Sequence, residues 1–209
     1  LRSRTKLLSQ AVIRARPSKP LKRPFVPSSG NRSKLLAPPI PIHYSFHMKA
    51  LFVYAYPAIF VPTSADRARM REYADAIGEL HILSPLDTDH EEVDGNLHLH
   101  GIRTPRLLRP RSLARRAREL ISVHGIDVVS AQDPFEQGYA AMRAIRGPPA
   151  KLHTQTHPDF LSPWYVRNGI YRSPRVRMPI LNRIRRVLAS RVLPQADGIR
   201  TVSHRVKDS

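Results

Sequence analysis

Short apolar runs alternate with longer amphipathic segments along most of the chain. The clearest apolar runs cover residues 49–54, 80–83 and 126–129, and their bulky, partly β-branched composition predicts buried strands. Residues 64–78, 112–125 and 133–147 instead carry apolar side chains at helical spacing. Further strands are expected at 97–102, 151–156 and 197–202, and a long helix at 176–193. This order predicts an α/β fold with a Rossmann-like, doubly wound parallel sheet.

The ends of the predicted helices carry ordinary start and stop signals. Ser64 is expected to cap the first helix, and Gly78 and Gly125 are expected to end the first and second. Ser112 is expected to start the second helix. In the long helix, we expect one side to be lined by Ile180, Ile184, Val187, Leu188 and Val192. Its many arginines would then lie in water, or the helix would rest on an acidic membrane surface.

The stretch from Ile126 to Tyr139 is central to both the predicted fold and the predicted ligand site. It reads as a buried strand followed by a helix that Asp133 caps and that Pro134 opens at the first helical position. Ligands of open α/β sheets bind beyond the carboxyl ends of the strands. Asp133 and Gln137 are therefore candidate ligand-binding residues; alternatively, Asp133 only caps the helix and Gln137 only faces water.

The charge is strongly positive and unevenly distributed. The 209 residues include 35 Lys and Arg against 16 Asp and Glu, and no cysteine. Residues 1–47 hold ten of the basic residues and no acidic one. Their proline- and serine-containing composition predicts a disordered leader, which also resembles a transit peptide, although Met48 is the expected native start. The remaining excess of 25 basic over 16 acidic residues favours anionic partners for residues 48–209.

Two groups of residues suggest metal ligands. Residues 87–95 contain five acids, but their spacing matches no calcium loop, so a solvated loop is the prediction. His98 and His100 fall on one face of a predicted strand. Without a third ligand we interpret that strand as an exposed edge, and we predict no metal site.

Four stretches together resemble the N-terminal domain of retaining GT-B glycosyltransferases of family 4. They are the opening strand at 48–53, the strand and turn at 126–134, the segment Gln-Thr-His-Pro-Asp-Phe at 155–160, and Ala-Asp-Gly-Ile-Arg-Thr-Val-Ser at 196–203. They occur in the family's order and span most of residues 48–209. The loop at 56–64 differs, because it lacks the Gly-Gly pair that family members often carry there.

The resemblance implies the N-terminal half of a GT-B fold and a hexosyltransferase activity for the full-length protein. A nucleotide-sugar would donate a sugar, with retained configuration, to a lipid or glycan acceptor. The resemblance implies that this domain holds the acceptor, that a C-terminal domain beyond Ser209 binds the donor, and that the fragment alone is inactive. It also implies a cytoplasmic protein, peripheral on the inner face of the membrane, without a cofactor.

The resemblance places His157 beside the transferred sugar as the catalytic residue. The candidate substrate-binding residues are Asp133, Gln137, Asp159, Trp164 and Tyr165. Each has a structural alternative: His157 as a strand-end residue bonded to a neighbouring loop, Asp159 as a cap, and Trp164 and Tyr165 as core. Two other functions remain open, namely a stand-alone α/β module for a phosphorylated ligand and a nucleic-acid-binding protein, with nucleic acid the less favoured partner.

Overall fold

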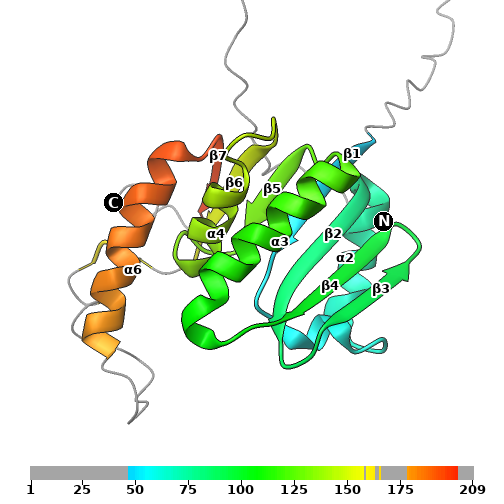
Figure 1. Ribbon diagram of the computed structural model, residues 1–209, viewed down its shortest axis with the longest axis horizontal. Coiled ribbons are helices and arrows are strands. Elements are labelled where there is room, and N and C mark those ends of the chain that lie inside the picture. Colours follow the sequence, from blue (N-terminus) through cyan, green and yellow to red (C-terminus); the bar gives the residue numbers. More distant parts are fainter. Residues whose placement is uncertain (1–46, 158, 163–164, 166–177, 202–209) are drawn as a thin grey trace, which may run out of the picture.

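The computed structural model describes residues 47–157, 159–162, 165 and 178–201, and it shows an α/β sheet domain (Figure 1). The strands are β1 (Met48–Val53), β2 (Gly78–Leu86), β3 (His90–Asp94), β4 (Leu97–Arg103), β5 (Val128–Ala131), β6 (Lys151–Thr156) and β7 (Gly198–Thr201). The α-helices are α2 (Ala65–Ile77), α3 (Arg109–His124), α4 (Glu136–Ala144) and α6 (Met178–Val192). Short 3-10 helices lie at Pro57–Phe60, Arg106–Leu108 and Leu193–Gln195.

The seven strands form one sheet in the order β3-β4-β2-β1-β5-β6-β7. All neighbouring strands are parallel except β3 and β4, which are antiparallel. Figure 1 shows α3 and α4 in front of the sheet and α2 behind it. The connections from β1 and from β5 therefore run to opposite sides of the sheet, and the prediction of a Rossmann-like, doubly wound fold is confirmed.

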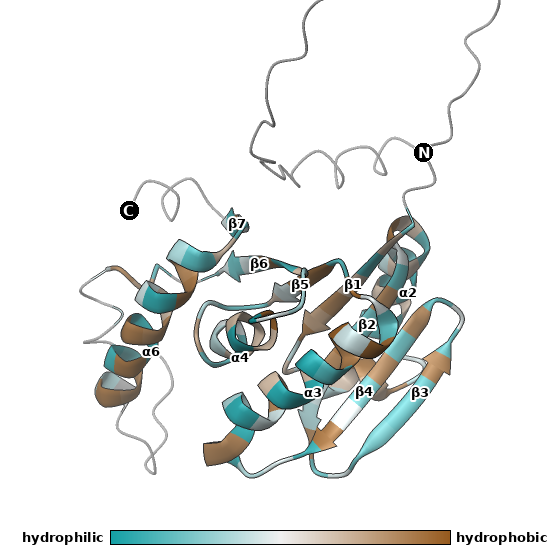
Figure 2. Cartoon of the chain, turned by 45° about the horizontal axis from the view of Figure 1, so that its top comes forward, coloured by the Kyte–Doolittle hydropathy of each residue, from teal (hydrophilic) through white to brown (hydrophobic). Residues whose placement is uncertain are grey.

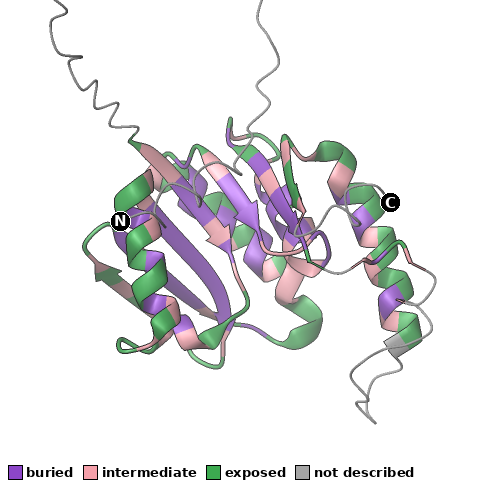
Figure 3. Ribbon diagram, turned by 180° about the vertical axis from the view of Figure 1, so that it is seen from behind, coloured by how far each residue is buried: buried purple, intermediate pink, exposed green. Residues whose placement is uncertain are grey.

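The sheet carries a hydrophobic layer on each face. Leu51, Val53 and Val129 pack with α3 and α4, whereas Leu80 and Ile82 pack with α2 on the other face. Figure 3 shows the central strands almost wholly buried and the outer sides of the helices exposed. In Figure 2, β1 is largely hydrophobic, while β3 at the edge is largely hydrophilic. The central strands are apolar on both sides because helices cover both faces of the sheet there.

Most predicted helix boundaries are confirmed, but the starts of α3 and α4 are not. Ser64 accepts a hydrogen bond from the backbone N–H of Arg67 at 3.1 Å, and Gly78 and Gly125 follow α2 and α3 with φ of +120° and +66°. The helix α3 begins at Arg109 rather than at Ser112. Pro110 lies in its first turn, where the fixed φ of proline suits a helix.

The acidic segment predicted to be a solvated loop is partly the strand β3, so that prediction was wrong. Residues 90–94 pair antiparallel with β4, and Gly95 makes the turn with φ +61°. Glu92 and Asp94 both accept hydrogen bonds from Arg67, whose side chain is buried. The acidic residues are thus counter-ions for a buried arginine, which the spacing of the carboxylates alone does not reveal.

The interpretation of His98 and His100 as residues of an exposed edge strand was also wrong. Because β3 pairs with β4, the strand that carries both histidines lies inside the sheet. His100 is only 5% exposed, and His98 is half-buried. The two histidines do share one face of the strand, as predicted.

The predicted apolar side of the long helix is also wrong for three of its five residues. Ile180, Ile184 and Val187 are about half exposed, with 50–51% of their surfaces accessible. The helix α6 instead turns Asn182, Arg185, Ala189 and Val192 toward the domain. Val192 approaches α4 closely at Gly138, which has no side chain there, and Ala189 packs with Phe135 and Phe160.

The predicted disordered leader falls outside the described residues, except for His47. Within the described part of the chain, no helix is both long enough and apolar enough to cross a membrane.

Candidate functional site

The candidate site lies where β1, β5 and β6 end. These three strands are adjacent and parallel, so their carboxyl ends meet at one edge of the sheet. The backbone N–H of Gln132, just after β5, donates to the carbonyl of Val53 at the end of β1. The connections that follow β1 and β5 diverge here, and such a switch point is where doubly wound sheets bind ligands.

The turn after β5 is shaped by Asp133. Its Oδ1 accepts a hydrogen bond from the backbone N–H of Phe135 at 2.8 Å. The helix α4 begins only at Glu136, and its N-cap residue, Phe135, makes no side-chain cap bond. Asp133 and Pro134 therefore form a turn before the helix, and the prediction that Pro134 occupies its first position was wrong. The buried Phe135 ring, packed near Phe160, holds the extra residues of this turn.

Burial changes the acidity of Asp133. Burial of the carboxyl raises the pKa of Asp133 to about 6, and the nearby charge of Glu136 acts in the same direction. The backbone hydrogen bond from Phe135 and the positive charge of Arg185 partly oppose this shift. A carboxyl group with a pKa near 6 can both accept and donate a proton close to neutral pH.

Gln137 supplies an unused acceptor in the first turn of α4. Its Oε1 atom is enclosed by protein and has no hydrogen-bond partner among the described residues. Buried side-chain oxygens in folded proteins almost always have a partner. A ligand hydroxyl or amide N–H can pair with this atom once a rotation of the Gln137 side chain exposes it.

Arg185 brings a positive charge to the same place from α6. Its Nε donates to Glu136 Oε1 at 3.1 Å, and its guanidinium lies 5.7 Å from the centre of the Phe135 ring. The nearby Glu136 raises the pKa of Arg185, while burial lowers it. Sequence reasoning missed Arg185 among the many arginines of this helix. Its spacing of four and seven residues from Ala189 and Val192, which are buried, was the available signal.

Tyr165 lies in a small aromatic cluster rather than on an open face. Its ring stacks on that of Phe135 with 6.0 Å between centres, and its carbonyl accepts a hydrogen bond from Asn182 at 2.7 Å. Burial raises the pKa of Tyr165, and Arg185 opposes that rise. The cluster thus holds Asp133, Tyr165 and Arg185 within electrostatic range of one another.

The residues after β6 reach the same edge. Thr156, the last residue of β6, is buried and donates to the carbonyl of Arg200 in β7 at 3.3 Å, and the exposed His157 follows it. Asp159 Oδ1 accepts from the backbone N–H of Ser162 at 3.1 Å, which gives this residue a turn-forming role. Trp164 lies outside the described residues. The structure therefore brings Asp133, Gln137 and Tyr165 together around α4 and places His157 on the same edge of the sheet.

His153, which sequence reasoning interpreted as packed, lies within β6, three residues before the carboxyl end of the strand. Its Nδ1 is 2.8 Å from the hydroxyl of Ser130 on β5, and burial lowers the pKa of His153. It links two central strands and does not reach the candidate site.

Comparison with known proteins adds no family to this description. No protein-family model matches the chain, and no curated protein matches it significantly.

Proposed function

We propose that this domain is the acceptor-binding half of a retaining glycosyltransferase that moves a sugar from a nucleotide-sugar to a lipid or glycan acceptor. The observation that carries the proposal is the unpaired Gln137 Oε1, which lies in the helix turn after Asp133 at a switch-point edge. Such a site suits a sugar, because each sugar hydroxyl can both donate and accept a hydrogen bond. The resemblance of residues 126–134 and 155–160 to family 4 enzymes supports the same edge.

The proposed roles follow from where the side chains lie. His157 is exposed at the end of β6, so its imidazole or its carbonyl can face the transferred sugar. In a retaining transfer, positive charge develops at the anomeric carbon, and an oxygen lone pair or a neutral imidazole nearby stabilises it. Gln137 Oε1 accepts a hydrogen bond from one hydroxyl of the acceptor. The carboxyl of Asp133 accepts a hydrogen bond from a second hydroxyl when it is ionised and donates one when it is protonated.

In the proposed enzyme, the donor binds to another part of the protein. We propose that a second domain binds the nucleotide-sugar and that residues 48–201 alone do not catalyse transfer. No step assigned to the residues above uses a cofactor. Asp159, Trp164 and Tyr165 remain proposed substrate contacts, with Tyr165 acting through its position beside Asp133.

A lipid acceptor suits the outer face of α6. Ile180, Ile184 and Val187 recur at helical spacing and are half exposed, and the exposed Arg183 and Arg191 lie beside them. Such a face favours an acidic membrane surface. We therefore propose a peripheral protein on the inner face of the membrane.

The test is a transfer assay on the native-length protein. The intact mass of the polypeptide in its own cells first establishes how far the chain extends. The purified protein is then given radiolabelled UDP-glucose, UDP-N-acetylglucosamine or GDP-mannose together with lipids extracted from the same cells. Transfer of label is compared for wild type, His157→Ala, Gln137→Leu and the control His90→Ala, whose exposed histidine lies on β3 at the far end of the sheet.

The expected result is label transfer by wild type and by His90→Ala, and a loss of at least a hundredfold with His157→Ala. Gln137→Leu is expected to raise the acceptor KM more than it lowers kcat. Wild-type rates from His157→Ala would remove the His157 imidazole from the site. A native chain that ends at Ser209, with no transfer from any donor, would overturn the glycosyltransferase proposal and leave a ligand-binding module.

A further inference from the structure

A cluster of histidines lies under α3, far from the candidate site. His81 on β2 is completely buried, and its partner in the sheet register is His98 on β4. The His81 and His98 rings stack with 4.5 Å between centres, and His124 at the end of α3 lies 4.4 Å from His81. Glu79 precedes His81 by two residues and therefore shares its face of β2. This group sits near the amino ends of the strands, opposite the edge that holds His157.

A line of contacts joins two carboxylates through two imidazoles. His81 Nε2 is 2.7 Å from Glu79 Oε1, and His81 Nδ1 is 3.0 Å from His100 Nε2. His100 Nδ1 in turn contacts Glu91, which is also paired with Arg116. Every contact in this line joins two atoms that can accept a hydrogen bond, so each needs one proton.

The protons do not suffice for the three contacts. A neutral imidazole carries one ring N–H, and a carboxylate carries none. His81 and His100 are both buried, and burial favours the uncharged form of an imidazole, so each ring carries one N–H. Two protons therefore serve three contacts. If His100 donates to Glu91 and His81 donates to His100, the bare Nε2 of His81 faces the carboxylate of Glu79.

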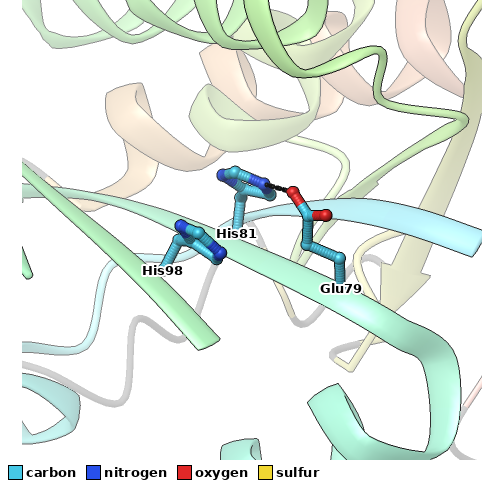
Figure 4. Close-up of side chains that lie close together, drawn as sticks. All are labelled: Glu79, His81 and His98. Atoms are coloured by element: carbon cyan, nitrogen blue, oxygen red, sulfur yellow. Dashed lines mark hydrogen bonds and ion pairs between the residues drawn. The ribbon is translucent and has the colours of Figure 1, made fainter. Parts of the chain in front are cut away.

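His98 lies beside the contact between Glu79 and His81, which is the contact left without a proton. A carboxylate oxygen of Glu79 and one ring nitrogen each of His81 and His98 lie within 4.8 Å of one another (Figure 4). Zinc bonds of about 2.0–2.2 Å hold tetrahedral ligand atoms about 3.3–3.6 Å apart. Small side-chain rotations that open the Glu79–His81 contact and bring in His98 reach that geometry.

We propose that Glu79, His81 and His98 bind a divalent transition-metal ion, for which Zn²⁺ is the best match. One carboxylate and two imidazoles form a common zinc ligand set, and three protein ligands leave a position for water. The ion would replace the missing proton between His81 and Glu79. This site is independent of the proposed glycosyl transfer and lies near the amino ends of β2 and β4.

The surroundings of the three ligands are those of a metal site. A metal-bound histidine usually donates its other ring N–H to a neighbouring acceptor, which fixes the ring. In the arrangement of protons given above, His81 donates its Nδ1–H to His100, and His100 donates its Nδ1–H to Glu91. Lys49 Nζ contacts Oε2 of Glu79 at 3.0 Å, so Oε1 of Glu79 stays available to the histidines. Glu79 and His98 are only partly buried, which gives an ion a path from solvent.

The test is zinc binding by the complete 209-residue chain after removal of metal with a chelator. Calorimetric titration with Zn²⁺ is expected to give one ion per chain at this site, and zinc is expected to raise the unfolding midpoint. Glu79→Gln and His98→Ala change partly exposed residues and are expected to weaken binding at least tenfold. His100→Ala is expected to weaken it about 10- to 100-fold through the orientation of His81. His90→Ala, outside the cluster, is the matched control and is expected to bind as wild type does.

A spectroscopic measurement on wild type does not depend on how the variants fold. Paramagnetic Co²⁺ is expected to broaden the imidazole signals of His81 and His98 and to leave that of His153 on β6 sharp. The proposal is wrong if the wild-type chain binds no stoichiometric zinc. It is also wrong if Glu79→Gln and His98→Ala, shown to be folded by circular dichroism, bind zinc as wild type does. In that case the contact between Glu79 and His81 holds a shared proton rather than a metal ion.

Discussion

A Cβ atom on Gly138 would stand 2.6 Å from the carbonyl oxygen of Asp133. The first turn of α4 therefore packs directly against the turn that carries the Asp133 carboxyl. Only a residue without a side chain fits at position 138. Because the atom in the way is backbone, it cannot swing aside as a side chain would. We predict that Gly138→Ala lowers the free energy of unfolding by about 1–3 kcal/mol, measured by urea denaturation, through the forced shift of this turn.

The control for this prediction is Gly198→Ala on β7. There a Cβ atom would meet only the side chain of His153, at 3.4 Å, which is ordinary contact. Gly198→Ala is expected to leave the free energy of unfolding within about 0.5 kcal/mol of wild type. Equal effects of the two substitutions would contradict the close approach of Gly138 to Asp133.

The raised pKa of Asp133 predicts a pH-dependent stability. The folded pKa is about 6 against an ordinary value of 3.8, so the folded state holds this proton more tightly than the unfolded state does. The contribution of Asp133 is therefore fully present below about pH 4 and is lost as the pH rises through 6. Asp133→Asn keeps an oxygen for the Phe135 N–H but carries no charge. Relative to wild type, the variant is expected to gain up to about 3 kcal/mol between about pH 4 and pH 8.

Urea denaturation of both proteins at several pH values measures this difference. Taking the difference removes the contributions of other titrating groups, including the histidines under α3. Asp75→Asn, on the exposed side of α2, corrects for the loss of one negative charge from a positively charged protein. A constant difference between wild type and Asp133→Asn across this pH range would show that burial does not shift the carboxyl.

The parts of the fold that could be predicted were those with local signals. The strands β1, β2 and β5 contain or adjoin apolar runs, and Ser64, Gly78 and Gly125 mark helix ends through their own backbone preferences. The acidic strand β3 has no apolar run, because its side chains serve Arg67 from another element. Such a pairing exists only once the chain is folded.

The candidate site divides in the same way. Asp133 and Gln137 were found from the sequence because they follow a recognisable strand, whereas His157 was named only through the family resemblance of residues 155–160. Arg185 was missed because four arginines lie close together on α6 and nothing local separates the one that faces Glu136. The other two proposed metal ligands, Glu79 and His81, were missed because the sheet register, not the sequence spacing, brings His81 next to His98.

The buried Arg67 gives a prediction about the edge strand. Its side chain is 1% exposed and donates to Asp94 at 2.9 Å and to Glu92. Removing it leaves two carboxylates close together without their cation and opens a space behind Ile59. We predict that Arg67→Ala lowers the free energy of unfolding by about 3 kcal/mol, measured by urea denaturation.

Arg69 is the matched control for Arg67. It lies on the same helix and pairs with Asp66, but half of its side chain is exposed. An exposed ion pair contributes about 0–1 kcal/mol, so Arg69→Ala is expected to have a small effect. If Arg67→Ala is as mild as Arg69→Ala, the acidic strand does not depend on the buried arginine.

The outer face of α6 gives a prediction about membranes. Ile184 is 51% exposed between Ile180 and Val187, and exposed arginines lie beside this stripe. An apolar stripe with arginines beside it inserts among lipid headgroups, and anionic headgroups strengthen the contact. We predict that the chain sediments with vesicles that contain phosphatidylglycerol and not with vesicles of phosphatidylcholine alone.

Substituting Ile184 by Glu tests whether this stripe makes the contact. Losing the insertion of one large apolar side chain, about 1.5–3 kcal/mol, corresponds to a roughly 10- to 100-fold weaker partition into the anionic vesicles. Val123→Glu adds the same charge at an exposed apolar position on α3, where Val123 is 71% exposed, and is expected to have a much smaller effect. If both variants weaken binding equally, the attraction comes from net charge spread over the protein, and α6 has no special part in it. If vesicle binding also persists at high salt in Ile184→Glu, neither the arginines nor the stripe accounts for it.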